Sequence, residues 1–299
     1  MSISIRDIIT HMKEGIVLLL GRPNVGKSTF VNNVIGQKVA ITSPKPQTTR
    51  FPIQGLYSDE RGRIIFTDTP GIFDKTKDSL AQKINRTTLE SVNKEFDAVL
   101  YFIDPTRKRD FEEARVLGIA RKIKAPVILV VNKNDKKQTY LPQYMFLEDE
   151  FKETFHISAL KSHGFEDLLD RLFEILSEEK EVSMVDPDHV YPLLNMDSKT
   201  FIAELIREKV FIMMGEEIPY STTAVVDKII ERKNNLMYIK ARILTTNDRH
   251  KKMLIGAAGR KIKELGSYAR KEIALAINKK VFLDVTVEVD PHWQEVLYS

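Results

Sequence analysis

The sequence of 299 residues predicts two domains: an α/β domain with a mixed, mostly parallel sheet, then a smaller α+β domain. Three observations support this prediction. In the first half, uninterrupted apolar runs typical of buried parallel strands alternate with helical stretches. A glycine-rich loop joins the first apolar run to a helix. In the second half, the expected order is helix, strand, strand, helix, helix, strand. We expect domains at 1–180 and 199–299, with a linker at 181–198.

The first elements follow from the apolar pattern. Ile16–Leu20 is expected to be a strand, and Thr29–Ile35 the helix after the glycine-rich loop. Lys38–Arg50 is rich in Pro, Ser and Thr without a sustained period, which predicts a long exposed loop. Phe51–Ser58 and Arg63–Thr67 then flank a polar turn, as the two strands of a hairpin do.

The remaining elements of the first domain continue the alternation. Helices are expected at Ser79–Lys94 and Phe111–Lys122, and strands at Ala98–Ile103, Pro126–Val131 and Phe155–Ile157. In sheets of this architecture, ligands bind at the carboxyl ends of the strands. The polar motifs of the first domain all fall at such ends.

The second domain is preceded by Asp186–Asp197, whose two prolines and weak periodicity indicate a linker. Its predicted elements are a helix at Thr200–Met214, strands at Thr222–Glu231 and Leu236–Thr245, a helical stretch at Met253–Ile277 broken at Gly256–Gly259, and a strand at Val281–Val289.

Composition limits the environment and the partners. Zero cysteines exclude disulfides and thiolate metal sites, and six histidines without ligand spacing argue against another metal centre. No apolar run approaches a membrane span, so we expect a cytoplasmic protein. Residues 228–280 hold 15 Lys and Arg against four acidic residues, although the net charge of the chain is only +4. This block favours a polyanionic partner, the alternative being the solvated face of a stable helix.

The glycine-rich loop GRPNVGKS, Gly21 to Ser28, fits the pattern G-x-x-x-x-G-K-[S/T] without a mismatch. Its glycines let successive backbone N–H groups point inward at a helix N-terminus, where a polyphosphate binds. Lys27 is expected to reach the outer phosphates and the Ser28 hydroxyl to bind Mg²⁺. The predicted phosphate-contacting residues are Gly21, Arg22, Pro23, Asn24, Val25, Gly26, Lys27, Ser28 and Thr29.

Three further motifs follow strands of the same sheet. Asp68 is expected to hold Mg²⁺ through water, and the Gly71 N–H to meet a terminal phosphate. A carboxylate such as Asp135 accepts two hydrogen bonds from the N–H and NH₂ edge of guanine, an edge that adenine lacks. The full predicted set is Asp68, Thr69, Pro70 and Gly71 with Ile72, then Asn132, Lys133, Asn134 and Asp135, then Ser158, Ala159 and Leu160.

These motifs in this order resemble the translation-factor-like branch of the GTPases. KPQTTR at 45–50, ELIREKV at 204–210, EIPYS at 217–221 and the basic block are similar to the Era family of bacterial ribosome-assembly GTPases over essentially the whole chain. The resemblance implies a P-loop GTPase domain and a type II KH domain. It also implies binding of GTP/GDP and Mg²⁺, with Lys27, Ser28 and Gly71 acting in hydrolysis.

The resemblance implies that the loop at 38–50 is a switch in which Thr48 or Thr49 closes over Mg²⁺. The sequence does not distinguish between the two threonines. Ile72 stands where Ras-like enzymes place a water-orienting Gln, so slow intrinsic hydrolysis is expected, dependent on a partner or a monovalent cation. Asn24 matches the Asn of potassium-dependent relatives, which suggests K⁺ as that cation.

The second domain contains a GxxG loop, which in KH domains clamps single-stranded nucleic acid. Family members usually carry a polar or basic residue within this loop, whereas this chain has Ala257 and Ala258. Basic residues on both sides can still supply charge, and a degenerate scaffold is the alternative. The predicted RNA-binding residues are Lys251, Lys252, Gly256, Ala257, Ala258, Gly259, Arg260, Lys261 and Lys263.

The function implied by the resemblance is a monomeric GTP-hydrolysing switch that binds small-subunit (16S) ribosomal RNA near its 3′ end and assists assembly of the small subunit. The main alternative is an RNA-binding module with a regulatory, barely hydrolytic nucleotide domain. Two others are a P-loop kinase, which NKND argues against, and a signalling GTPase associated peripherally with the inner membrane, for which no amphipathic anchor is found.

Overall fold

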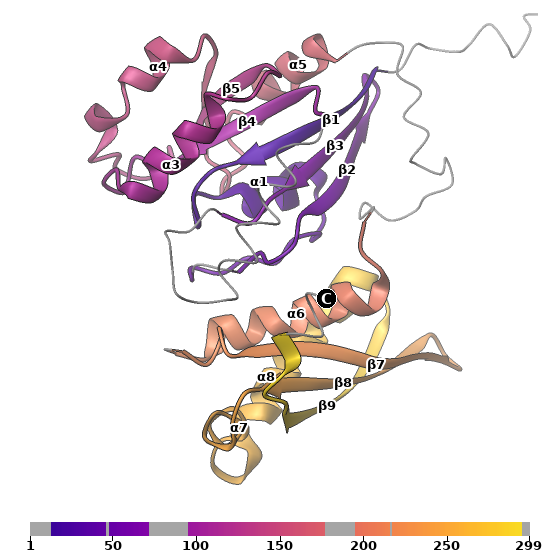
Figure 1. Ribbon diagram of the computed structural model, residues 1–299. Helices are drawn as coiled ribbons and strands as arrows, with labels where there is room; N and C mark the ends of the chain where they lie inside the picture. Colours follow the sequence, from indigo (N-terminus) through magenta and orange to yellow (C-terminus); the bar gives the residue numbers. More distant parts are fainter. Residues whose placement is uncertain (1–12, 46–47, 72–94, 177–194, 216, 295–299) are drawn as a thin grey trace, which may run out of the picture. The chain divides into compact units, whose positions relative to one another are not determined.

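The computed structural model describes residues 13–45, 48–71, 95–176, 195–215 and 217–294 (Figure 1). Ile72, the helix expected at 79–94 and most of the expected linker lie outside these residues. The chain forms two compact units, one of residues 1–40 and 49–195 and the other of residues 41–48 and 196–299.

The first unit contains a mixed sheet in the order β2-β3-β1-β4-β5-β6 (Figure 1). Only the β2–β3 pair is antiparallel, so the expected hairpin and the mostly parallel sheet are both present. The strands are β1 (Lys13–Leu20), β2 (Ile53–Asp59), β3 (Gly62–Asp68), β4 (Ala98–Ile103), β5 (Val127–Val131) and β6 (Thr154–His156).

Each face of this sheet carries its own hydrophobic core, because side chains alternate along a strand. Val17 and Leu19 of β1 face a core shared with α1 (Lys27–Ile35) and α5 (Phe165–Ile175). Leu18 and Leu20 face a second core with α3 (Phe111–Ala120) and α4 (Phe146–Glu150). The sheet is therefore covered on both faces, which holds the carboxyl ends of its strands at one rigid edge.

The second unit is a three-stranded sheet in the order β7-β8-β9, with helices packed on one face (Figure 1). β7 and β8 are antiparallel, and β8 and β9 are parallel. Its elements are α6 (Ser198–Met213), β7 (Thr222–Arg232), β8 (Leu236–Thr245), α7 (Asp248–Ile255), the 3₁₀ turn η3 (Ala257–Gly259), α8 (Arg260–Ile277) and β9 (Lys280–Val289). This is the α-β-β-α-α-β order expected from the sequence.

The loop expected to be exposed at 38–50 is largely buried, and residues 41–48 belong to the second unit. Ile41 lies in the core beside α6. The Thr42 N–H donates to Glu208 Oε1 at 2.7 Å, and Lys45 Nζ donates to the Phe211 carbonyl at 2.5 Å. The polar composition of this loop hides its burial, because its polar residues are satisfied by hydrogen bonds to α6.

The sequence pattern did not predict α4, α5 or the 3₁₀ turn η2 (Leu141–Gln143). Helix α5 has a clear apolar face in Phe165, Leu168, Leu169, Leu172 and Phe173, so periodicity alone could have found it. Among the described residues, none of the helices has the length and apolarity to cross a membrane.

Candidate functional site

The loop between β1 and α1 has the backbone of a phosphate loop. Gly26 adopts φ 106° and caps α1, and a Cβ on it would lie 2.2 Å from Asn132 Nδ2. A Cβ on Gly21 would lie 2.7 Å from the Phe102 carbonyl oxygen. Asn24 is left-handed at φ 62°. The glycines of the motif are therefore required both by backbone conformation and by close packing.

Lys27 curls back over this loop. Its Nζ donates to the carbonyl oxygens of Gly21 at 3.0 Å and Arg22 at 3.3 Å. Burial lowers the pKa of Lys27, while the charges of Asp68 and Glu113 oppose that shift. The ammonium group thus stands over the loop, where it can exchange carbonyl partners for a phosphate.

Ser28, Asp68 and Thr49 converge beside Lys27. Ser28 Oγ donates to Asp68 Oδ2 at 2.5 Å and lies 3.2 Å from Thr49 Oγ1. Asp68 is fully buried, and its Oδ1 has no hydrogen-bond partner among the described residues. Thr48 instead donates its hydroxyl to the Lys45 carbonyl at 2.7 Å. A hard oxygen-donor set with an unpaired buried carboxylate oxygen fits Mg²⁺, and of the two threonines Thr49 is the one that lies beside it.

Opposing effects act on the pKa of the Asp68 carboxylate. Burial raises its pKa, and the Lys27 charge and the Ser28 hydrogen bond oppose that rise. The next residues fix the turn: the Thr69 hydroxyl donates to the Leu19 carbonyl at 2.7 Å. A Cβ on Gly71 would meet Pro23 N at 2.5 Å, so the DTPG turn packs directly on the phosphate loop.

Asn132 joins three loops. Its Nδ2 donates to the Val25 carbonyl at 2.6 Å, and its Oδ1 accepts from the Ala159 N–H at 2.9 Å. The Ala159 N–H is therefore engaged with Asn132 in this structure. Ser158 Oγ donates to Asp135 Oδ1 at 2.6 Å, which lowers the pKa of Asp135. The carboxylate expected to bind guanine is therefore held ionised and oriented.

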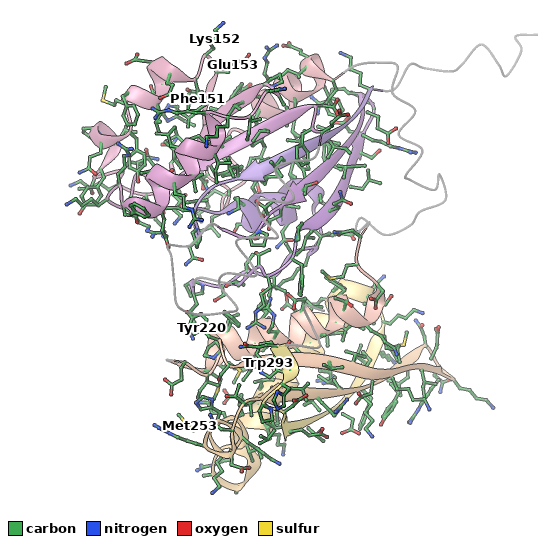
Figure 2. All side chains as sticks on the ribbon, viewed as in Figure 1. Phe151, Lys152, Glu153, Tyr220, Met253 and Trp293 are labelled. Carbon is green, nitrogen blue, oxygen red and sulfur yellow. The ribbon has the colours of Figure 1, made fainter. Side chains whose placement is uncertain are left out.

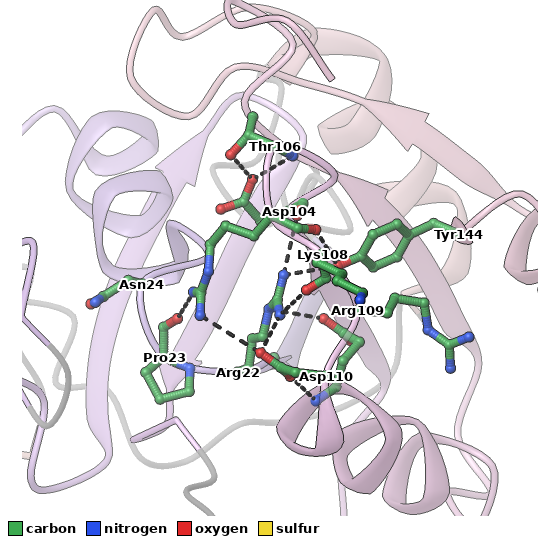
Figure 3. Close-up of polar contacts among 12 residues, drawn as sticks. Arg22, Pro23, Asn24, Asp104, Thr106, Lys108, Arg109, Asp110 and Tyr144 are labelled. Carbon is green, nitrogen blue, oxygen red and sulfur yellow. Dashed lines mark hydrogen bonds and ion pairs between the residues drawn. The ribbon is translucent and has the colours of Figure 1, made fainter. Parts of the chain in front are cut away.

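Arg22 belongs to the predicted phosphate-contacting set, and its side chain turns away from the loop and is fully buried (Figure 3). Its guanidinium donates to Asp110 and to the Tyr144 hydroxyl, both at 2.8 Å, and lies 3.2 Å from Glu113 Oε2. This contact with Glu113 is an ion pair without hydrogen-bond geometry. A phosphate contact by Arg22 would therefore be made by its backbone N–H, as in other phosphate loops.

Sequence reasoning missed the residues that surround Arg22 and the NKND lysine. Asp104 follows β4 and accepts from Lys133 Nζ at 2.5 Å, and the same ammonium donates to the Asn24 carbonyl at 2.9 Å. Arg107 donates to the Pro23 carbonyl at 3.0 Å. Asp104 could have been found from the sequence, because it is an acidic residue at the carboxyl end of a buried strand.

In the second unit, the GAAG segment separates α7 from α8. Gly256 and Gly259 have φ 72° and 71°, and Ala258 is left-handed at φ 52°. Ala257 and Ala258 are exposed, as are Lys252, Arg260, Lys261 and Lys263, while Lys251 is half-buried. Trp293 is buried in this unit, where its indole N–H donates to the Ser221 carbonyl at 3.3 Å (Figure 2). It therefore serves packing.

The comparisons with known families agree with this architecture. Residues 16–133 match the family described as a 50S ribosome-binding GTPase, and residues 217–294 match the KH domain. Together with the loops described above, they define a P-loop GTPase followed by a KH domain.

The individual relatives narrow the class. "GTPase Era" of Halothermothrix orenii is 36% identical over 95% of both chains, and that of Trichlorobacter lovleyi is 39% identical over 95% of this chain and 94% of the relative. A crystal structure of Era in complex with MgGDPNP and nucleotides 1506–1542 of 16S ribosomal RNA matches with a TM-score of 0.85, at 33% identity over 95% of this chain and 96% of that one. A variant of Aquifex aeolicus Era bound to GDP and AlF₄⁻ gives 0.84, at 32% identity over the same shares. The chain belongs to the Era family of GTPases.

Proposed function

We propose that this GTPase is a switch that hydrolyses GTP, binds small-subunit ribosomal RNA near its 3′ end and assists assembly of the small subunit. The observation that carries the proposal is the convergence of Lys27, Ser28, Asp68 and Thr49 in the first unit of a chain whose second unit is a KH domain. The solved relative bound to 16S ribosomal RNA supports the choice of RNA.

In this proposal, Lys27 and the backbone N–H groups of the phosphate loop and Gly71 stabilise charge on the transferring phosphoryl group during attack by water. Ser28, Thr49 and Asp68 would hold Mg²⁺, which supplies neutralising charge to the phosphates. The remaining motif residues position the nucleotide, with Asp135 accepting from guanine.

The loop at 38–50 connects the two activities. Thr49 contacts Ser28 in the first unit, and Thr42, seven positions earlier, contacts Glu208 in the second. Ordering of Thr49 on bound GTP would act on a segment in which Thr42 and Lys45 are hydrogen-bonded to α6. Such ordering of a loop by a terminal phosphate is a common switch.

The test is the affinity for a short single-stranded RNA from the 3′ end of 16S ribosomal RNA, measured at fixed salt with GDP and with a non-hydrolysable GTP analogue. Tighter binding with the analogue supports the switch. Equal affinity would favour an RNA-binding module with a regulatory nucleotide domain, and no binding would refute the RNA target.

The proposal includes K⁺ as an activating cation, on the ground of Asn24 in the phosphate loop. Hydrolysis should be several-fold faster in KCl than in NaCl at equal ionic strength, with Asn24→Ala abolishing the difference. Equal rates for the unmodified protein would remove K⁺ from the mechanism.

A further inference from the structure

The sheet of the second unit has one face in the core and one face that no helix of the described part of this unit covers. Ile239, Ala241 and Ile243 of β8 point into the core. The alternate side chains therefore point to the other face. Across the three strands, the register places these outward residues in rows: Arg232, Leu236 and Lys280; Ile230, Tyr238 and Phe282; Lys228, Lys240 and Asp284. We call these nine residues the platform.

A stack of planar groups crosses the platform. The Arg232 guanidinium lies 4.4 Å from the Tyr238 ring centroid, and Tyr238 stacks on Phe282 with centroids 5.8 Å apart and an interplanar angle of 16°. Because β9 is the edge strand, the stack ends at Phe282, whose side chain is 54% exposed. A further planar group can continue the stack there.

The platform is basic. Its four cations surround the aromatic pair, and its single acid, Asp284, accepts from the Tyr238 hydroxyl at 3.1 Å. Lys228 stands directly opposite Lys240, and both are exposed. Like charges in cross-strand register destabilise a sheet. Within the described residues, neither lysine has a carboxylate at ion-pair distance. Asp284, in register with Lys240 on β9, and Asp227, whose pKa the Lys240 charge helps to lower, offset part of this repulsion, and a bound polyanion would relieve the rest.

The basic surface continues around the sheet edge. An open pocket of 590 Å³ shares Leu236 and Lys280 with the platform and adds Arg270 and Lys279. Lys279 is paired with Glu231 at 2.8 Å, whereas Arg270 is exposed. The pocket lies at the C-terminal end of α8, a helix of 18 residues, and the GAAG loop precedes its N-terminus. At about 1.5 Å per residue, the two lie about 27 Å apart.

We propose that the platform is a second RNA-binding surface, on which an unpaired base stacks against Phe282 while Lys228, Lys240 and Lys280 contact the adjacent phosphates. The inference rests on the proposed RNA-binding function and extends it to a site distinct from the GAAG loop. Base stacking on aromatic rings combined with a cationic track is the usual chemistry of single-strand binding. The platform also compensates for the lack of polar side chains in the GAAG loop, because it adds affinity through another part of the same RNA molecule.

The stack ends in an exposed aromatic ring with cations around it, which favours RNA over a protein partner. A protein that bound here would have to present an acidic rim around an apolar centre. The experiment separates these. Phe282→Leu keeps apolar area but removes the ring, Phe282→Trp keeps a ring, and Leu275→Ala changes another exposed apolar residue of the unit, 81% exposed on α8. Fluorescence of the buried Trp293 verifies the folding of Phe282→Leu and of Leu275→Ala.

The probes are single-stranded RNAs of about 6 and about 20 nucleotides from the 3′ end of 16S ribosomal RNA, measured by anisotropy at fixed salt. A KH loop clamps about four nucleotides, so only the longer RNA reaches both sites. Phe282→Leu should weaken the longer RNA about 5- to 150-fold and leave the shorter one unchanged. Phe282→Trp and Leu275→Ala should bind like the unmodified protein. For the longer RNA, Lys240→Gln should lower the slope of the logarithm of affinity against the logarithm of salt concentration by about 1.

Unchanged binding of the longer RNA by Phe282→Leu overturns the inference and leaves the proposed function intact. If the unmodified protein binds neither RNA, the proposed function itself fails. Phosphatidylglycerol vesicles serve as the competing probe: binding that Phe282→Leu abolishes, together with unchanged RNA affinity, would assign the platform to a membrane surface instead.

Discussion

Replacing Arg22 with Met tests whether a buried ion pair holds the phosphate loop in place. Arg22 and Glu113 are both fully buried, and Arg22 also donates to Asp110 and Tyr144. Removing one partner of a buried pair leaves an uncompensated charge and costs about 3–5 kcal/mol. We expect Arg22→Met to lose about this much stability in the first unit and to bind GDP more weakly.

The pH dependence identifies Glu113 as the stranded group. Burial raises the pKa of Glu113 above 4.5, against a hydrogen bond from Tyr101 and the charge of Arg22. Between the ordinary and the raised pKa, the folded state binds more protons than the unfolded state, so stability falls as pH rises. Without Arg22 the folded pKa rises further and this window extends upward. The deficit of Arg22→Met should therefore be larger at pH 8 than at pH 5.

Urea-dependent hydrogen exchange measures this deficit in the β4 amides, Ala98–Ile103, with the β8 amides of the second unit as an internal reference. The double variant Arg22→Met with Glu113→Gln should recover about 1–3 kcal/mol of the loss at pH 8. A deficit below about 1 kcal/mol that is the same at both pH values would refute the reasoning.

Three further predictions concern the nucleotide site. Gly26→Ala should abolish GDP binding in a fluorescent-nucleotide assay, since its Cβ would lie 2.2 Å from Asn132 Nδ2, whereas Gly36→Ala, at φ 74° with nothing within 4 Å, should cost only about 1 kcal/mol and bind normally. Asn132→Ala loses both buried side-chain hydrogen bonds, so a fall in Tm and about 10-fold or greater loss of GDP affinity are expected; unchanged affinity contradicts its role. Because burial raises the pKa of Asp68, protonation on acidification should weaken the Mg²⁺ dependence of GDP affinity at a higher pH than for an ordinary carboxylate, and Asp68→Asn should remove this trend; a flat titration of the unmodified protein would exclude it.

The sequence predicted the order of most elements because apolar periodicity depends on local patterns. It also placed the four motifs of the nucleotide site at strand ends, where the sheet brings them together. It did not reveal the burial of the Arg22 side chain, since the letters of a motif do not say which side chains face the ligand. It failed at residues 41–48, whose polar side chains suit an exposed loop equally well. Their burial depends on α6, more than 150 positions away.

The packing of Ile41 beside α6, and the hydrogen bonds of Thr42 and Lys45 to that helix, limit how far the two halves of this protein are interchangeable modules. A fragment starting near residue 196 carries all the strands of its sheet but loses Ile41 from its core, and leaves Glu208 without the Thr42 N–H. Recombination that exchanged only the C-terminal segment would impose the same loss. Inheritance of the C-terminal half is therefore tied to eight residues encoded far upstream, and substitutions on α6 are expected to be accompanied by substitutions within 41–48.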